Sequence, residues 1–433
     1  MIIQHKSEKG QALIFIVIGF VVILGFVGLA IDGGRVYSDR RHAQNSADAA
    51  SLAGGAAAAL TMENSRLFYD QYNCGGDLRE VTEAAYNAAI ARAASNGFVI
   101  DRDVTDFHGV KVECGVDYST GFEDKYMDVI VDLTTVTQAY FAQFFSNESL
   151  TSQVTATTRV RPRIPFAWGH AVVAMGKQDC SGNKYGTIFG GTSEVNIVGG
   201  GVFSNGCMNG NGQPFNVTVT GGTLMYAGQL DPGNGDWSYQ NGSTSGTYPQ
   251  HALHPLPDRA TEIPHPDCND PRAHHVTTLK ESDFPLKEEG LWCVDGTADV
   301  KINGGEICAV DCNNPGRVTI VFEHGDVEIN GGNALVKLSS PENTPDPSPG
   351  VPGLLFYLAE GSLELTGNNT TYLEGTIYAP NGEIKMHGTA GMQPTFNTQL
   401  VGEHVDVTGN YDLDIVFDQG RSYQIPTCIE LNR

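Results

Sequence analysis

The stretch Ala12-Leu-Ile-Phe-Ile-Val-Ile-Gly-Phe-Val-Val-Ile-Leu-Gly-Phe-Val-Gly-Leu-Ala-Ile31 is an uncharged apolar run near the start of an otherwise polar, acidic chain. Its length matches the ~20 residues that an α-helix needs to cross the hydrocarbon core of a bilayer. A cleavable signal peptide has a shorter apolar core, ~7–15 residues, followed by a small-x-small cleavage site. Here Asp32-Gly-Gly-Arg35 leads directly into a further helical stretch. The run therefore predicts a retained transmembrane helix, with a cleaved signal or a buried core helix as the alternatives.

Composition limits what the rest of the chain can be. Acidic residues outnumber basic ones, 50 to 26, giving a formal net charge of −24. Binding to phosphates needs clustered Lys and Arg, so nucleic acid is not expected as a partner. The 52 glycines, with only 18% charged residues, are typical of a turn-rich β protein rather than a disordered one.

The nine cysteines indicate an oxidising compartment. Cys74 with Cys114, and Cys180 with Cys207, are candidate disulfides, although connectivity cannot be deduced from sequence and the odd count leaves one thiol over. The spacing Cys308-x-x-x-Cys312 is too tight for a metal site without a second pair.

Orientation is less clearly encoded than the span. Lys6 and Lys9 precede the run, whereas Arg35, Arg40 and Arg41 follow it, so the positive-inside rule alone does not place the N-terminus in the cytoplasm. The large cysteine-bearing C-terminal part favours the opposite side from the reducing cytosol. We expect a single-pass protein of the cell membrane: residues 1–31 form a cytoplasmic tip and the membrane helix, and the bulk is extracytoplasmic (N-in, C-out).

Residues 32–165 predict an α+β domain. Small and apolar residues continue at helical spacing after the span, which predicts one helix from about Ala12 to Leu60. A second helix is expected from about Leu78 to Asn96, because Asn96-Gly97 is a good C-terminal stop. Alternating apolar residues then predict an antiparallel sheet with strands at 110–112, 127–133 and 154–160.

This N-terminal region resembles a known family. The segments that carry the likeness are Gly10-Gln-Ala-Leu13, Gly28-Leu-Ala-Ile-Asp-Gly-Gly-Arg-Val-Tyr37, Gln44-Asn-Ser-Ala-Asp-Ala-Ala50, Ser95-Asn-Gly97, and Phe141 to Phe145 with Val154-Thr-Ala156. Together they are similar to the N-terminal region of TadE/TadG-like Flp (tight-adherence) pilus-assembly proteins. The resemblance implies a membrane-anchored, pilin-like bacterial protein associated with a pilus or secretion machine.

Two departures from related patterns narrow this expectation. Type IV prepilins usually have a glutamate five residues after the cleavage glycine, but the position counted from Gly10 is Phe15, so neither processing at Gly10 nor entry into a filament shaft is expected. The stretch Asp117-Tyr-Ser-Thr-Gly121 lacks the second serine of the Asp-x-Ser-x-Ser motif. A von Willebrand A domain is therefore not expected.

Small residues along the first helix are candidate membrane-anchor and helix-packing positions. They are Gly19, Gly25, Gly28, Ala47 and Ala50. Such residues allow close approach between helices, so the helix could pack against copies of itself or partner pseudopilins. The alternative is a stalk that packs only on its own domain. In the first case the alanine face should be exposed in the isolated chain, and leucines at Ala47 and Ala50 should weaken association without affecting folding.

Residues 166–433 have a repeated pattern, apolar-x-apolar-x-Gly. Copies occupy Val195–Gly199, Val217–Gly221, Val300–Gly304, Val327–Gly331, Leu363–Gly367, Ile384–Gly388 and Val405–Gly409. Near-constant steps of 21 or 22 residues separate several of them, which is typical of a solenoid with one strand per repeat. The pattern predicts a right-handed parallel β-helix of roughly seven to nine rungs, with a β-sandwich or jelly roll as the alternative. Gly375-Thr-Ile-Tyr-Ala-Pro-Asn381 resembles surface β-helix modules of the pectin-lyase-like type.

An irregular Gly/Pro/His-rich insertion is expected at about 222–298. Its histidines are His251, His254, His265, His274 and His275. With Asp267 and Cys268 they could supply zinc ligands, but their spacing fits no recognised motif, and a solvated loop is favoured. Trp168, Trp237, Trp292 and Tyr239 could stack on sugars or pack in a core. No metal or other cofactor is expected.

Polysaccharide lyases with a β-helix need acidic calcium ligands and a basic proton acceptor. The outward positions expected on or beside the strands include Asp299, Glu328, Glu364, Lys385 and Asp406, but no clustered acid/base pair is visible. No catalytic residue is therefore assigned. The favoured hypothesis is a non-enzymatic surface protein that docks at a tight-adherence apparatus, with the β-helix as spacer or adhesive tip. The alternative is a tethered β-helix that binds or cleaves an envelope or extracellular polysaccharide, with a surface glycan as partner.

Overall fold

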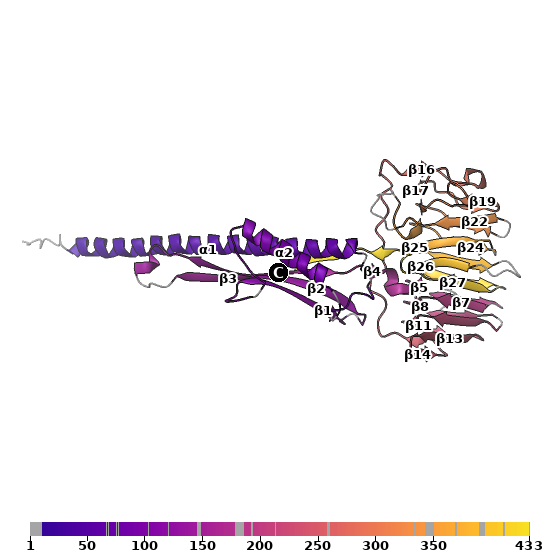
Figure 1. Cartoon of the computed structure of the whole chain (residues 1–433), viewed down its shortest axis with the longest axis horizontal. Helices are drawn as coiled ribbons and strands as arrows, with labels where there is room; N and C mark the ends of the chain where they lie inside the picture. Colours follow the sequence, from indigo (N-terminus) through magenta and orange to yellow (C-terminus); the bar gives the residue numbers. More distant parts are fainter. Residues whose placement is uncertain are drawn as a thin grey trace, which may run out of the picture. The chain divides into compact units, whose positions relative to one another are not determined.

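The computed structural model covers the 433-residue chain and describes all residues except 1–10, 66, 68, 75, 77, 103, 120, 145–148, 178–185, 192–193, 213, 258–259, 332–333, 343–349, 369, 389–394, 410–411 and 433. The chain forms two compact units, whose elements are labelled in Figure 1. The head unit comprises Met1–Arg163 and Pro426–Arg433. The β unit comprises Ile164–Ile425.

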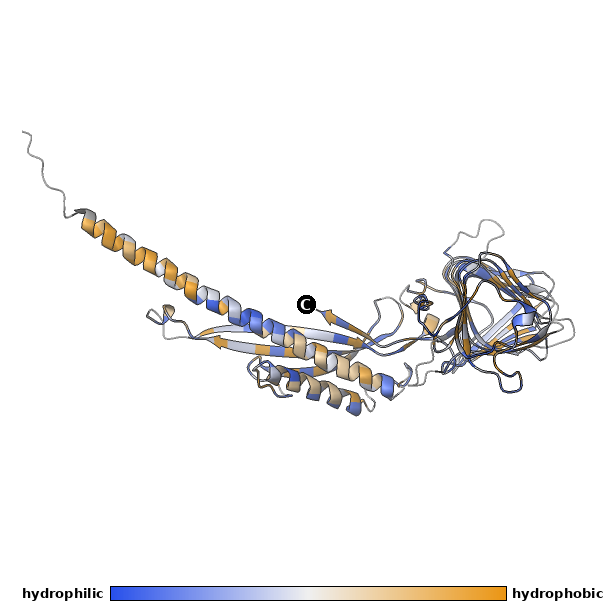
Figure 2. Ribbon diagram, turned by 90° about the horizontal axis from the view of Figure 1, so that it is seen from above, coloured by the Kyte–Doolittle hydropathy of each residue, from blue (hydrophilic) through white to orange (hydrophobic). Residues whose placement is uncertain are grey.

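The head unit is built on one long helix, α1 (Gln11–Asn64). Figure 2 shows the hydrophobic colouring of its first part, where the side chains are exposed; Phe15, for example, is 73% exposed. The helix is long and apolar enough to cross a membrane, as in a single-pass membrane anchor. Both expected helices are confirmed, since α2 (Arg79–Ser95) follows at the predicted place.

The C-terminal half of α1 packs against α2 and an antiparallel sheet. The sheet has the strand order β1 (Gly109–Asp117), β2 (Asp124–Thr137), β3 (Leu150–Arg161) and β29 (Cys428–Asn432). At Gly54 the helix approaches both neighbours closely, because a Cβ atom there would lie 2.8 Å from Val129 Cγ1 and 2.9 Å from the carbonyl oxygen of Ala85. Small residues on α1 thus allow it to contact the second helix and the sheet at one level.

The last strand of the chain completes the head sheet. β29 pairs antiparallel with β3, and Ile429 lies opposite Val160. The repeat pattern predicts a second domain over residues 166–433, and this C-terminal boundary is wrong, since Pro426–Arg433 belong to the head unit. The β unit is therefore inserted in the chain between two neighbouring strands of the head sheet.

The β unit is a stack of short parallel strands around a common interior, seen in Figure 2. Through much of it each strand pairs with the strand three positions later: β17 (Gly290–Val294) with β20 (Val318–Phe322), and β18 (Val300–Ile302) with β21 (Val327–Asn330). Parallel pairing of this kind argues against the β-sandwich alternative, whose sheets are antiparallel.

The repeated motif sets the register of this stack. Val195 lies opposite Val217, and Leu363 lies opposite Ile384, which in turn lies opposite Val405. All five side chains are buried. Because equivalent apolar positions stack on one another, each strand buries a face that it could not bury alone.

The order of the stack differs from the order of the chain. β5 (His170–Ala174) pairs on one side with β8 (Gly201–Ser204) and on the other with β26 (Thr395–Gly409). Val172 thus lies opposite both Val202 and Leu400. The first strands of the unit therefore lie in the middle of the stack, and the last strands return to pair with them.

The segment expected as an irregular insertion at 222–298 is partly regular. β11 (Leu224–Tyr226) pairs in parallel with β8, and β13 (Asp236–Asn241) pairs in parallel with β10 (Asn216–Thr220). The Pro- and His-rich part, residues 252–276, leads from β15 (Gln250–His251), which pairs with β11, to β16 (His274–Val276), which pairs with β17 at the other end of the stack (Figure 1). We call residues 252–276 the strap.

Hydrogen bonds and a disulfide attach the strap to the stack along its course. The backbone N–H of Leu256 donates to Asn205 Oδ1 at 2.8 Å, and the hydroxyl of Tyr378 donates to the carbonyl oxygen of Thr261 at 3.1 Å. Further on, Cys268 is bonded to Cys293 on β17. The strap is therefore bound to strands far apart in the sequence.

Candidate functional site at the end of the apolar run

The apolar run of α1 ends at a buried carboxylate. Asp32 is 3% exposed and accepts hydrogen bonds from the backbone N–H groups of Tyr140 (2.8 Å), Phe141 (2.9 Å) and Ala142 (2.7 Å). Burial opposes ionisation, but these hydrogen bonds and the nearby charge of Arg35 outweigh it and hold the pKa of Asp32 below its ordinary value. The ionised side chain thus fixes the connection between β2 and β3 to α1.

Gly28 allows this connection to approach the helix. A Cβ atom at Gly28 would lie 2.8 Å from both Cβ and Cγ of Phe141, so a larger residue would displace the aromatic ring. At Gly19 and Gly25, no described atom lies within 4 Å of the corresponding position. Of these three candidate glycines, Gly28 packs within the head unit.

Two further residues complete the contact. The Arg35 guanidinium lies over the ring of Tyr140, 4.2 Å from its centroid, and Thr137 Oγ1 donates to Asp39 Oδ2 at 2.6 Å. Residues 28, 32, 35 and 39 share one face of α1, because steps of three and four residues return to the same side of a helix. We call Thr137–Phe144 the docking loop. The helical spacing of residues 28, 32, 35 and 39 was the signal in the sequence that could have revealed the site.

The alanines of α1 pack inside the head unit. Ala47 and Ala50 have no exposed surface and belong to the core formed with α2 and the sheet. The expectation of an exposed alanine face, free for a partner, is therefore wrong. The alternative, packing on the chain's own domain, describes these two residues.

Disulfides occur in both units. In the head unit Cys74 is joined to Cys114. In the β unit Cys207 is disulfide-bonded, while Cys180, proposed as its partner, lies outside the described residues. Two further bridges, Cys268–Cys293 and Cys308–Cys312, had not been assigned from the sequence. Cys428 lies exposed on β29.

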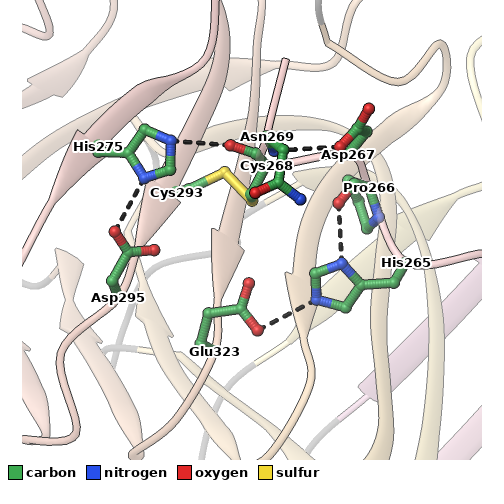
Figure 3. Close-up of a disulfide and its surroundings, with 9 residues drawn as sticks. All are labelled: His265, Pro266, Asp267, Cys268, Asn269, His275, Cys293, Asp295 and Glu323. Carbon is green, nitrogen blue, oxygen red and sulfur yellow. Dashed lines mark hydrogen bonds and ion pairs between the residues drawn. A yellow bond between two sulfur atoms is a disulfide. The ribbon is translucent and has the colours of Figure 1, made fainter. Parts of the chain in front are cut away.

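The strap histidines contact hydrogen-bond acceptors (Figure 3). His275 lies 2.8 Å from Asp295 through Nδ1 and 2.8 Å from the carbonyl oxygen of Cys268 through Nε2. Only the protonated ring donates from both nitrogens, and the hydrogen bond to Asp295 raises the pKa of His275. Cys268 is in a disulfide and provides no thiolate for zinc.

His265 has a similar environment. Its Nδ1 lies 2.8 Å from the carbonyl oxygen of Pro266, and its Nε2 lies 3.1 Å from Glu323 (Figure 3). Within the described residues, no three His, Cys, Asp or Glu side chains form a group that could hold a metal ion. Of the five histidines considered as zinc ligands, His265 and His275 instead link the strap to the stack.

Four of the five outward polar residues considered for lyase chemistry form a row across neighbouring strands, which Lys301 extends by one strand: Lys301, Glu328, Glu364, Lys385 and Asp406. Lys301 Nζ lies 2.7 Å from Glu328 Oε2, and burial raises the pKa of Asp406. Asp299 lies outside this row, and its Oδ1 accepts a hydrogen bond from the backbone of Asp326 at 3.0 Å. Three neighbouring pairs in the row have opposite charges, which favours strand pairing, whereas Glu328 and Glu364 are neighbours of like charge.

A cavity of about 500 Å³ lies on the β unit. It is lined by Leu335, Lys337, Thr370, Thr371, Tyr372, Thr395 and Asn397. This lining contains one basic residue and no carboxylate. The hydroxyl of Tyr372 donates to Glu374, which also binds Arg317 (2.9 Å) and Arg421 (2.6 Å). The cavity therefore lacks the several carboxylates that polysaccharide cleavage would require.

Two aromatic residues considered for sugar stacking lie in the core. Trp237 and Tyr239 are 3% and 4% exposed, and Trp237 contacts the edges of Phe189 and Phe215. A sugar-stacking role for these two side chains is therefore excluded. Trp292 stacks on His274 with their ring centroids 4.7 Å apart.

Comparison with known protein families agrees with the division of the chain. Residues 10–59 match the Tad family model, described as Flp pilus-assembly TadE/G-like. Residues 283–420 match a domain of unknown function, DUF7305. No curated protein and no solved structure matches the chain. The first match contains the apolar run and every α1 residue that contacts the docking loop, and the second covers β17 to β26 and β27 (Leu413–Val416).

Proposed function

We propose that this chain is a membrane-anchored, surface-exposed, pilin-like structural protein that acts with the tight-adherence (Flp) pilus machinery in assembly, adhesion or secretion. The observation that carries the proposal is the TadE/G-like match at residues 10–59, which includes both the apolar run and the helix face that holds the docking loop. A helix that both crosses the membrane and packs against its own domain would hold the folded head at a defined distance from the membrane.

The β unit is proposed to be a parallel β-helix that serves as a spacer or adhesive tip. Support comes from the parallel pairing of successive motif copies and from the stacking of their apolar residues. The disulfides support an extracytoplasmic location, with the N-terminus in the cytoplasm. We assign no enzymatic activity to this unit, because both lysines of the outward charged row are held in ion pairs, Lys301 with Glu328 and Lys385 with Glu383.

A partner must contact a surface that the head leaves open. Because Ala47 and Ala50 are buried, the exposed apolar side chains farther along α1, Leu52 (39%) and Leu60 (62%), are better placed to pack against a pilus component. An exposed leucine pair on a pilin-like helix is a suitable contact for a second helix.

Site-specific photo-crosslinking in native membranes tests this function. A photoreactive residue at Leu52 or Leu60 should cross-link to pilus-assembly proteins, identified by mass spectrometry. The matched control places the same residue at Val99, which is 83% exposed but lies after α2. Cross-links at positions 52 and 60 no more abundant than at position 99 would argue against a partner on this face.

A further inference from the structure

The exposed surface at the end of the apolar run is aromatic and basic. Tyr140 and Phe141 are 57% and 38% exposed, although both belong to a loop held by buried hydrogen bonds. Arg40 and Arg41 are exposed and form no ion pair within the part of the chain that the structure describes. In a chain of net charge −24, exposed arginines without carboxylate partners are unusual and indicate an anionic neighbour.

The contact with Gly28 shows where along the apolar run of α1 the docking loop lies. Gly28 lies three residues before Ile31, the end of the apolar run, which is ~4.5 Å along a helix. Because Phe141 packs directly on Gly28, its ring lies at the level of the last turn of that run. Tyr140 contacts Asp32 and Arg35, and so lies just outside it.

We propose that the docking loop is embedded in the membrane interface, with Phe141 at the boundary of the acyl chains, Tyr140 among the headgroups, and the neighbouring arginines facing lipid phosphates. The inference rests on the proposed membrane anchoring by α1. Amphipathic aromatic rings favour the interfacial region, and arginine binds phosphate oxygens through its planar group of donors.

A lipid surface fits these side chains better than a protein partner does. Phe141 is continuous with the exposed apolar side chains of the run, such as Leu29 (72%), and any bilayer that surrounds the run must also reach the residue packed against it. A bound protein would have to displace lipid at this level. The loop would give the head a second attachment to the membrane beside the helix and so restrict its tilt.

Quenching by brominated lipid tests the proposal on the full-length protein. The variants Tyr140→Trp and Phe141→Trp each add one fluorophore to the three native tryptophans, all of which lie in the β unit. Each is reconstituted in vesicles of phosphatidylcholine and phosphatidylglycerol, with and without lipid brominated near the headgroup end of the acyl chain. The wild-type protein in the same vesicles gives the baseline.

The matched control is Tyr118→Trp. Tyr118 is 63% exposed in the turn between β1 and β2, next to the strand end where Lys125 Nζ donates to the carbonyl oxygen of Tyr69, beyond the C-terminal end of α1. This places it roughly 50 Å along the helix from the end of the run. Circular dichroism establishes that each variant is folded.

We expect the emission added at position 140 or 141 to be largely lost in brominated vesicles, and the emission added at position 118 to be unchanged. Protein that floats with the vesicles but shows no quenching at position 140 would overturn the embedded loop and leave the membrane anchor standing. Failure to float would contradict the anchor itself. The two failures are thus distinguishable, and Tyr140→Trp keeps the test valid if Phe141→Trp does not fold.

Discussion

Glu63 holds together the two points at which the chain passes between head and β unit. Its Oε1 accepts hydrogen bonds from the backbone N–H (2.9 Å) and the hydroxyl (2.6 Å) of Thr427, and its other oxygen pairs with Arg163. Arg163 is the last head residue before the β unit, and Thr427 precedes β29. We therefore predict that Glu63→Ala weakens the attachment of β29 to the head sheet.

The size of the effect follows from these contacts. A hydrogen bond to a charged group contributes about 1.5–3 kcal/mol, and loss of one partner leaves the others unsatisfied. Because the Glu63 side chain is 29% exposed, water replaces part of what is lost, and we expect a total of about 2–3 kcal/mol. This corresponds to a roughly 30- to 160-fold increase in local opening.

Hydrogen exchange measured by mass spectrometry reports this opening directly. Amides of β29 should exchange faster by that factor in Glu63→Ala. The matched control is Glu113→Gln, which removes an exposed ion pair with Lys111 and should change exchange in β29 very little. An increase at β29 no larger than that of the control would show that Glu63 does not hold this strand on the head sheet.

The Glu63 carboxylate also makes the attachment of β29 to the head sheet depend on pH. Burial opposes ionisation, but Arg163 and Thr427 outweigh it, and the pKa of Glu63 lies below its ordinary value. A depressed pKa in the folded state means that this stabilisation is present above the unfolded pKa of ~4.3 and is lost as the pH falls through the folded value. Protection of β29 should therefore decrease more in acid in the wild type than in Glu63→Ala, where the ion pair of Glu430 with Arg161 still titrates.

Three further predictions follow from the head and the strap. Ala50→Leu should destabilise the head by about 1–3 kcal/mol through overpacking, measured as a lower thermal midpoint; an unchanged midpoint would contradict the buried alanine face. Gly28→Leu should release the docking loop and make it sensitive to chymotrypsin in detergent. Gly33→Leu should not, because no described atom lies within 4 Å of a Cβ atom at that position. Equal resistance of the two variants would show that the loop is held elsewhere. Because the pKa of His275 is raised, its contact with Asp295 should be fully present below pH ~6.5 and lost as the pH rises through the folded value, seen as increasing exchange of the strap. The same pH profile in Asp295→Asn would count against that ion pair.

Local patterns in the sequence predicted much of the fold. The apolar run and the alanine-rich segments gave α1 and α2 to within a few residues, because helix periodicity is a property of neighbours in the chain. The apolar-x-apolar-x-Gly motif identified positions that lie opposite one another in parallel strands. Both signals are local and repeated.

The features that were missed depend on contacts distant in sequence. Repeat spacing does not show that β5 lies between β8 and β26, because any exposed strand edge of similar length could accept a neighbour. The short strand β29 does alternate, with Ile429 and Leu431 between Glu430 and Asn432, but five alternating residues do not show which sheet they join, and the partner strand β3 lies far away in the sequence. For Trp237 and Tyr239 the sequence leaves sugar stacking and core packing open, because the surrounding glycines and asparagines predict an irregular segment, and only the structure places both side chains in the core.

The alanines of α1 and its contacts with the docking loop could not be assigned from the sequence for a second reason. A small residue on a helix allows close packing against either its own domain or a partner, and only the structure places Ala47 and Ala50 in the core. Asp32 was interpreted as the end of the span. Its role as an acceptor for three backbone N–H groups depends on a loop more than a hundred residues away.

We propose that the chain with this TadE/G-like segment associates with a pilus apparatus. Affinity purification of the full-length protein from native membranes, followed by mass spectrometry, tests this association directly. An unrelated single-pass protein purified in parallel gives the background. We predict that pilus or secretion components are enriched above that background. Recovery of the chain alone, or with glycan bound to the β unit, would contradict it and favour a tethered carbohydrate-binding protein.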